Sequence, residues 1–404
     1  MQKITAAIIV AGLAAPGSLL AGVSPEQWLA DGKINLDLRY RYEQVEQDNA
    51  LRDAHAQTLR TRLGLQSAEL YGVSLLLEAD NVSRVGDARY NSTRNGQAEY
   101  SVVADPDGTE INQALLSYRH ALAELRLGRQ RINLDNQRFI GGVAWRQNEQ
   151  TFDAAQLLLK PLAGMALSYT YIDQVNSIFG PHGTHGFAAG PANIEGHSHL
   201  LNLSYEWTPA VKFTAYQYRL GLDNLLAGTQ SSITSGLRLS GQHAGWEYVA
   251  EHSWQREHAD NPQQLDSRYH LLELGRHIGA LQLKAGHEVL GAGDQPGMAF
   301  QTPLATKHLF QGWADVYLST PSDGVRDLWL GGSYPLLGGR LQAWYHDYRA
   351  DKGGDNYGRE LDLAWGRAVP GINGLQALVK YAHYDARDFA VDTNKLWLQL
   401  QYSL

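Results

Sequence analysis

Cysteine is absent from the 404 residues, which excludes disulfides, thiolate catalysis and cysteine-ligated zinc. Long apolar runs are also scarce. Residues 4–15 form the only one, and no later segment approaches the roughly 20 apolar residues that a membrane-spanning helix needs. Charged residues make up only 19% of the chain, below the roughly 25% typical of soluble domains. These deficits together exclude a disulfide-stapled domain and an α-helical membrane protein.

Basic charge is limited as well. The chain has 34 Lys and Arg against 42 Asp and Glu, a formal net charge of -8, which argues against a nucleic-acid partner. Glycine and tyrosine are abundant instead, with 41 and 21 copies. This mixture favours strands and turns over helices, and a β-barrel can use the whole length as one domain.

The N-terminus has the layout of an export signal. Residues 1–3 supply a positive start, residues 4–15 an apolar centre, and residues 16–21 a break that ends at the small residue Ala21. We therefore predict a signal peptide over residues 1–21 and a single domain over residues 22–404. The same pattern predicts export from a bacterial cytoplasm.

Apolar and polar residues alternate in several stretches of the predicted domain. From Ile34 to Glu43, every second residue is apolar or aromatic and each residue between is polar. Such alternation is typical of a strand with two chemically different faces. The pattern returns in five further stretches, at residues 199–207, 246–250, 272–274, 361–365 and 396–404. The clearest runs reach about nine residues, close to the 9 to 11 that a tilted strand needs to cross a bilayer.

The connections between these strands alternate in length, as they do in outer-membrane barrels. Eight short joints are expected at residues 69–72, 120–122, 161–164, 208–210, 241–245, 278–280, 335–339 and 369–374. Nine longer ones are expected at residues 47–52, 84–109, 131–149, 176–196, 223–230, 257–266, 291–324, 350–355 and 386–392. We predict an all-β fold, a transmembrane antiparallel up-and-down β-barrel of about 18 strands, give or take two. A barrel of this size encloses an aqueous channel.

A large soluble β-sandwich or propeller is the alternative, because its strands would also alternate. The export signal and the connection lengths favour the membrane barrel. So do aromatic residues at the expected strand ends, where they would form interfacial girdles. These aromatic residues are Tyr40, Tyr42, Trp207, Trp246, Trp254, Tyr357, Trp365 and Tyr402.

The polar face of each strand predicts a lumen of mixed charge. Its expected bases are Arg39, Arg41, Arg60, Arg62, Arg126, Arg238, Lys284 and Lys380. Its expected acids are Asp37, Glu43, Glu78, Asp80, Glu124, Glu206, Glu247, Glu251, Glu273, Glu288, Glu360 and Asp362. Charges of opposite sign across a water-filled pore would orient polar solutes. Cross-strand salt bridges that stiffen the wall are the alternative.

Arginine is densest between residues 126 and 146. This segment holds Arg126, Arg129, Arg131, Arg138 and Arg146, with Asp135 among them. The planar guanidinium matches carboxylates, so a cluster of arginines near a constriction could pass acidic groups from site to site. An ion-paired loop folded into the barrel mouth is the alternative.

This segment also resembles the alginate export family of outer-membrane porins. The matching stretches are LGRQRINLDNQRFIG (127–141), WRQN (145–148), TFD (151–153), TPLAT (302–306), GWAD (312–315), TPSDGVRD (320–327) and LRYRYE (38–43). The resemblance implies an 18-stranded barrel and diffusion of an anionic polysaccharide through an arginine-lined pore. It also implies that Arg129, Arg131, Asp135, Arg138 and Arg146 shape the constriction. Asp315, Arg326 and Asp327 would anchor the long loop near it.

The expected function is therefore that of an outer-membrane porin for anionic solutes, with a uronate polysaccharide such as alginate as one candidate. A general small-solute porin is the main alternative. An adhesin or a hydrolase is a further one, although Ser253 beside His252 and Ser267 near His270 lie an odd number of residues apart and would point to opposite faces. No cofactor or metal is expected, despite four histidines within residues 182–199. The expected partners are outer-membrane lipid, the solute and the barrel assembly machinery. Residues 402–404 resemble the C-terminal signal by which this machinery recognises outer-membrane barrels.

Overall fold

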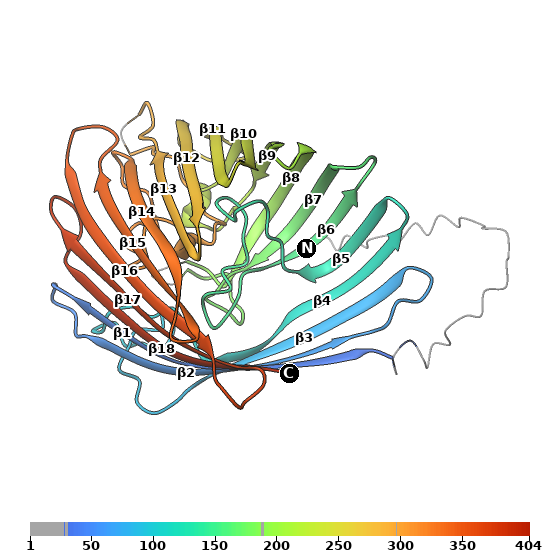
Figure 1. The fold of residues 1–404 in the computed structure, drawn as a ribbon, viewed down its shortest axis with the longest axis horizontal. Coiled ribbons are helices and arrows are strands. Elements are labelled where there is room, and N and C mark those ends of the chain that lie inside the picture. Colours follow the sequence, from blue (N-terminus) through green and yellow to red (C-terminus); the bar gives the residue numbers. More distant parts are fainter. Residues whose placement is uncertain (1–27, 29–30, 187–189, 296) are drawn as a thin grey trace.

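The structure is a computed structural model that describes residue 28 and residues 31–186, 190–295 and 297–404. The predicted signal peptide over residues 1–21 lies outside the described residues. Eighteen strands form one antiparallel sheet in which each strand pairs with its neighbours in the sequence (Figure 1). Pairing of β1 with β18 closes this sheet into a barrel. The predicted fold class and strand count are confirmed.

The strand bounds follow the alternating stretches of the sequence. The first nine strands are β1 (Lys33–Gln47), β2 (Ala54–Gln66), β3 (Val73–Arg84), β4 (Gly108–His120), β5 (Ala123–Gln130), β6 (Thr151–Leu159), β7 (Met165–Asn176), β8 (Asn193–Thr208) and β9 (Val211–Leu220). The last nine are β10 (Ser232–His243), β11 (Trp246–Glu257), β12 (Asp266–Ile278), β13 (Leu281–Leu290), β14 (Val325–Leu336), β15 (Gly339–Arg349), β16 (Asn356–Ala368), β17 (Leu375–Ala386) and β18 (Thr393–Ser403). Long and short connections alternate from β3 to β15 as expected. The two connections before β3 and the three after β15 are each six residues long, so the predicted alternation does not hold there.

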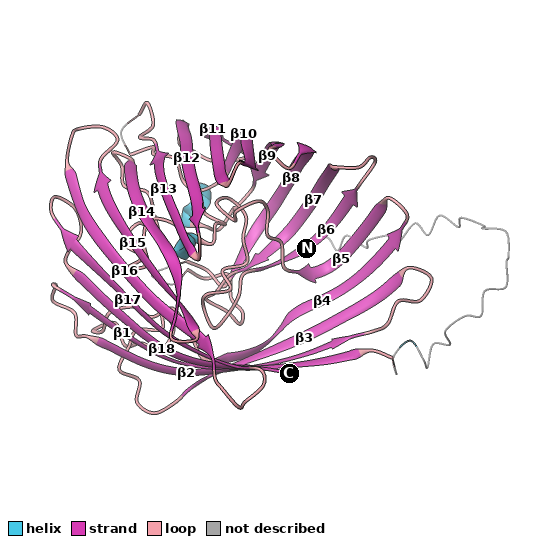
Figure 2. Ribbon diagram, viewed as in Figure 1, coloured by secondary structure: helices cyan, strands magenta, loops and turns pink. Residues whose placement is uncertain are grey.

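Helical structure in the described part of the chain is confined to short pieces, and none of its helices is long and apolar enough to cross a membrane. Two 3₁₀ turns, η1 (Leu226–Gly228) and η2 (Lys307–Leu309), lie in long loops. Figure 2 shows loops lying inside the ring of strands rather than only above it. These inward loops leave the barrel with a narrowed interior.

The two faces of the wall differ as the period of two requires. On β12, Leu272 is 60% exposed on the outer face, while Leu271 beside it faces the interior and is 4% exposed. Hydrophobic residues that are exposed on the outer wall recur on many strands, including Leu63, Leu116, Leu201, Leu237, Leu328, Leu361 and Leu398. Such an apolar band is suited to lipid tails. Most of the predicted lumen charges lie on the opposite, inward face.

One predicted girdle residue lies elsewhere. Tyr357 is 3% exposed and packs between Tyr317 and Phe389, with ring centroids 6.2 and 4.8 Å away. The register of β16 shifts opposite Tyr348 and Arg349, so residues beyond this irregularity no longer follow the parity of the strand. The interfacial role predicted for Tyr357 is therefore wrong. Trp207, Trp246 and Trp254 do lie exposed on the outer wall.

Candidate functional site

Two long loops meet inside the barrel and narrow it. The β5–β6 loop (residues 131–150) and the β13–β14 loop (residues 291–324) are joined by backbone hydrogen bonds: Gly141 donates to Leu304 O at 2.9 Å, and Thr306 donates to Gln137 O at 3.1 Å. Buried apolar side chains of both loops pack together at this junction, including Phe139, Ile140, Phe300 and Leu304. We call this junction the constriction. Its side chains are held in place by both loops and by the wall.

Arg146 is the centre of one charge cluster in the constriction. Its guanidinium lies 3.0 Å from Glu43 on β1, 3.7 Å from Asp105 and 3.5 Å from Asp315. Burial alone would lower the pKa of Arg146, but the three carboxylates outweigh burial and raise the pKa. Asp315 also accepts a hydrogen bond from Lys395 on β18 at 3.0 Å. Arg146 and Asp315, both predicted site residues, are therefore brought together as an ion pair.

Glu149 is the centre of a second cluster. It lies 2.5 Å from Arg62 on β2 and also pairs with Arg131. Arg62 reaches Asp80 at 2.6 Å, and Arg131 pairs with Glu78, so three carboxylates surround two guanidinium groups. Burial would raise the pKa of Glu149, but Arg62 and Arg131 outweigh it and lower that pKa to about 2. The predicted residues Arg62 and Arg131 thus lie side by side with their charge neutralised.

Arg138 and Asp135 connect the β5–β6 loop to further strands of the wall. The side chain of Arg138 is 2% exposed and lies 3.0 Å from Glu288 on β13. Asp135 accepts hydrogen bonds from Asn202 at 2.8 Å and from the Tyr218 hydroxyl at 3.4 Å. The loop is therefore pinned by Asp135 to the nearby strands β8 and β9 and by Arg138 to β13 across the barrel.

Arg39, Arg41 and Arg60 face inward as predicted. Arg39 donates to the carbonyls of Ala144 and Arg146 at 3.0 and 2.6 Å and so fastens the β5–β6 loop to β1. The guanidinium of Arg41 lies 4.0 Å from the ring centre of Trp145. Arg60 pairs with Asp37 at 2.5 Å. Among the described residues, no carboxylate lies within 4.0 Å of Arg39 or Arg41.

Two predicted pore residues lie on the outer wall. Arg129 shares the outward parity of Leu125 and Leu127, and its guanidinium pairs with Asp153 at 2.7 Å. Arg326 shares the parity of Leu328 and donates to Ala350 O and Asp351 O at 3.2 and 2.7 Å. Their side chains are on the lipid side of the strands. Arg129 therefore does not shape the constriction as expected, and Arg326 is hydrogen bonded to the β15–β16 loop rather than to the long β13–β14 loop that it was expected to anchor.

Arg126 and Asp327 face inward but do not join the arginine clusters. Arg126 pairs with Glu124 at 2.7 Å, close to the two-residue turn between β4 and β5. Asp327 accepts hydrogen bonds from His346 at 3.0 Å on the lumen face of β14 and β15. Asp327 thus pairs with a residue of the neighbouring strand β15 and not with the long loop that it was expected to anchor.

Lys380 faces the interior as predicted, whereas Lys395, Trp397 and Asp105 were not predicted from the sequence. The Nζ of Lys380 lies 3.7 Å from the ring centre of Trp313 and 4.2 Å from that of Trp145. Lys395 and the fully buried Trp397 face inward on β18. The alternation that identified Leu396, Leu398 and Leu400 as outward already placed their neighbours inward, so this signal was present. Asp105 lies in a loop and gave no such signal.

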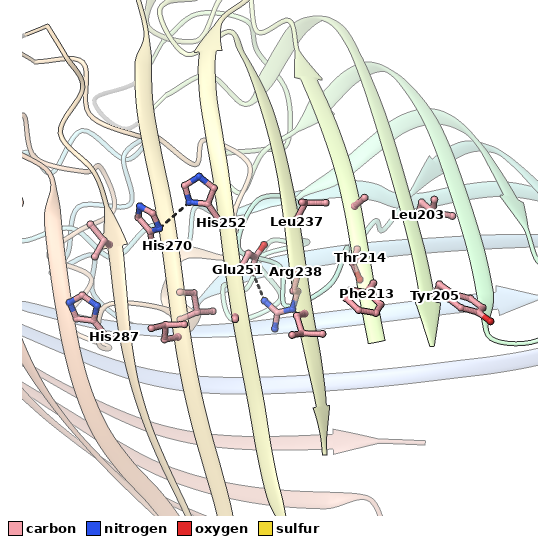
Figure 3. A pocket seen from close by; sticks show the side chains of 16 residues that line it. Leu203, Tyr205, Phe213, Thr214, Leu237, Arg238, Glu251, His252, His270 and His287 are labelled. Carbon is pink, nitrogen blue, oxygen red and sulfur yellow. Dashed lines mark hydrogen bonds and ion pairs between the residues drawn. The ribbon is translucent and has the colours of Figure 1, made fainter. Parts of the chain in front are cut away.

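A groove of about 740 Å³ lies on the wall of β8 to β13, lined mainly by outward residues such as Leu237, Ala250 and Leu272 (Figure 3). At its edge the Nδ1 atoms of His252 and His270 lie 2.9 Å apart. Ser253 points to the interior and hydrogen bonds with the Tyr216 hydroxyl, so it does not meet His252. Within the described ranges, no group of three His, Asp or Glu is placed to hold a metal ion.

Comparisons with known proteins agree with this architecture. A sequence profile of the family described as alginate export matches residues 32–292, more than half of the chain. OccK3 (OpdO) of Pseudomonas aeruginosa is similar in structure, with 17% identity, 95% of this chain and 98% of that chain covered, and a TM-score of 0.71. The outer membrane protein opdK of Pseudomonas aeruginosa is 15% identical, with 93% and 99% covered and a TM-score of 0.71. OccAB4 of Acinetobacter baumannii is 14% identical, with 92% and 98% covered and a TM-score of 0.70. No curated protein sequence matches the chain.

Proposed function

This chain belongs to the alginate export family, whose members are porins of the bacterial outer membrane, and from that premise we propose that it passes small polar solutes. Porins of this kind are channels rather than enzymes, and their wall contacts membrane lipid. The finer question is which solutes the constriction admits.

The charge balance of the constriction carries this proposal. Arg62, Arg131, Arg138 and Arg146 each have a carboxylate within 4.0 Å. A polyuronate would have to replace these protein carboxylates, and breaking a buried ion pair costs about 3–5 kcal/mol. A long anionic polymer would meet such a cost at every cluster. Small solutes that pass without breaking the pairs fit this arrangement better.

Preference for anionic solutes is a second candidate function. Arg39, Arg41 and Lys380 lie close to the constriction, and in the described part of the chain no carboxylate is within 4.0 Å of any of them. Basic side chains without a direct carboxylate partner near a narrow passage favour anions, because low-dielectric walls focus their field. A second crystal structure of the similar protein OpdK of Pseudomonas aeruginosa was determined with vanillate, an aromatic carboxylate. This makes small organic anions a reasonable class to test.

Planar-bilayer recordings of the purified protein test the proposal. We expect discrete conductance steps, weak ion selectivity in a salt gradient, and no block by uronate oligomers. Arg131→Ala should shift the reversal potential toward cations, because it leaves Glu149 and Glu78 less neutralised. Arg129→Ala is the matched control and should leave the reversal potential unchanged, since its side chain lies on the outer wall.

Two outcomes would contradict this view. Absence of conductance would exclude a channel. Strong anion selectivity with block by uronate oligomers would replace small-solute diffusion with transport of an anionic polysaccharide.

The route to the membrane completes the proposal. Residues 1–21 act as a signal peptide, and the barrel assembly machinery recognises the terminal strand. N-terminal sequencing of protein isolated from outer membranes should begin at residue 22, and a start at Met1 would contradict this route.

A further inference from the structure

A small pocket of about 220 Å³ lies in the lumen next to residues 309–313, which we call the tip of the β13–β14 loop. Four neighbouring strands and the loop tip line it, and the residues used here are Glu273, Lys284, Asp327, Trp329, Trp344 and His346. At about 30 Å³ per molecule, the pocket holds about seven waters. It is smaller than the roughly 300 Å³ at which pockets for drug-sized ligands begin. A single ring fits this space better than a polymer segment.

Glycines of the barrel wall set the position of the indole rings of Trp329 and Trp344. A Cβ on Gly286 would lie 2.3 Å from Trp329 Cζ2, and a Cβ on Gly331 would lie 2.3 Å from Trp344 Cε3. Gly286 is paired with Trp329 across β13 and β14, and Gly331 with Trp344 across β14 and β15. Each indole therefore lies against bare backbone of the neighbouring strand. Trp329 and Trp344 are half-buried and leave part of their ring surface open to the pocket.

The two rings form a corner rather than a stack. Their centroids are 5.7 Å apart and their planes meet at 71°. Trp313 of the loop tip is a third indole that lines the same space. Aromatic faces attract the apolar C–H face of a saturated ring as well as other aromatic rings. The shape alone thus indicates a ring-shaped ligand.

The charges of the pocket select among such rings. Glu273 lies 3.1 Å from Lys284, Asp327 lies 3.0 Å from His346, and Glu288 is paired with Arg138. Each of these carboxylates already has its own cationic or protonatable partner. Lys284 is the only Lys or Arg among the described residues that line the pocket, and it is paired with Glu273, so the lining offers an anion no unpaired cation. The Glu273–Lys284 pair is partly exposed and offers both an acceptor and donors to hydroxyl groups.

We propose that this pocket is a binding subsite for a neutral, hydroxylated ring such as a hexose unit. The C–H face of the ring packs on Trp329 and Trp344, and its hydroxyls hydrogen bond to Glu273 and Lys284. This inference rests on the proposed function, because a solute reaches the pocket only through the lumen. It adds a class of solute and a place where that solute pauses.

Calorimetric titration of the detergent-solubilised protein with methyl α-glucoside tests the subsite, with glucuronate and benzoate titrated in parallel. We expect saturable binding of the glucoside. The affinity should fall about tenfold in Trp329→Leu, and by a similar factor in the separate variant Trp344→Leu. Trp329→Phe keeps an aromatic face and should keep most of the affinity. Trp207→Leu is the matched control, because Trp207 is 68% exposed on the outer wall.

The paired change Glu273→Gln with Lys284→Met leaves both indoles in place and should also weaken binding. This variant decides the matter if the leucine variants fail to assemble. Absence of saturable glucoside binding, or unchanged affinity in these variants, would overturn the subsite. Tighter binding of glucuronate or benzoate would overturn the neutral class of ligand. Bilayer conductance without glucoside binding would count against the subsite alone, whereas absence of conductance would count against the channel.

Discussion

At the scale of single residues, Glu149 makes an electrostatic contribution to stability that can be tested by one substitution. It holds Arg62 and Arg131 together, and all three connect the β5–β6 loop to β2. Its pKa falls from 4.5 to about 2 in the folded protein. At about 1.36 kcal/mol per pH unit, this difference corresponds to about 3 kcal/mol of stabilisation at neutral pH.

We expect Glu149→Gln to free the β5–β6 loop. Because the lost stabilisation is about 3 kcal/mol, amide exchange in residues 131–150 should speed up by about a hundredfold at pH 7. Hydrogen–deuterium exchange with mass spectrometry measures this change. Glu124→Gln is a suitable control, because Glu124 pairs with Arg126 away from the loop.

The same residue predicts a pH dependence. A lowered folded pKa means that the stabilisation is complete above about pH 4.5 and is lost as the pH falls toward 2. In the unchanged protein, exchange in the loop, corrected for the intrinsic rate, should therefore rise over this window. In Glu149→Gln this rise should be smaller, and an equal rise in both proteins would show that other carboxylates hold the loop.

At the scale of elements, the interlocked loops decide how open the lumen is. The Thr306 hydroxyl accepts a hydrogen bond from the Val143 N–H at 3.0 Å and donates one to Gln137 Oε1 at 2.8 Å. A Cβ on Gly141 would lie 2.2 Å from that hydroxyl, so the two loops touch without spare room. The Thr306 side chain therefore joins the two loops by two hydrogen bonds.

Thr306→Val should loosen this junction. The change keeps the shape but leaves the Val143 N–H unpaired, which costs about 1–3 kcal/mol. We expect a larger and noisier open-channel current in planar bilayers. Thr229→Val is the control, since the hydroxyl of Thr229 bonds only to Leu226 O in an exposed loop. An unchanged current would mean that the loops are held by their apolar contacts instead.

Elements also show how far the sequence alone could lead. The wall was predictable because alternation fixes the face of each strand residue, and the confirmed strand count came from the number of expected connections. The positions of the arginine side chains between residues 126 and 146 were not predictable in this way, because β5 ends at Gln130 and strand parity stops there. Arg129 still obeys strand parity and faces outward, whereas Arg131 lies beyond the strand and turns to Glu149. Partners such as Arg138 and Glu288 lie far apart in the sequence, and no local pattern connects them.

At the scale of the whole molecule, the apolar outer band requires lipid. Leu272→Arg places a charge on this band, and an arginine near the middle of the bilayer costs about 2–4 kcal/mol. Equilibrium unfolding by denaturant in lipid vesicles should show a loss of this size. Leu226→Arg is the matched control, because Leu226 is 65% exposed in a loop outside the strands. Equal losses in both variants would mean that the band does not face lipid.

The seam between β1 and β18 has a consequence for how this molecule comes into being. Those strands pair from Asp37 with Ser403 to Gln47 with Thr393, so the last strand completes the hydrogen bonding of the first. A sheet that lacks β18 keeps two unpaired edges, and each edge can pair with a strand of another chain. Removal of β18 (Thr393–Ser403) would therefore leave an open sheet that aggregates rather than a smaller barrel.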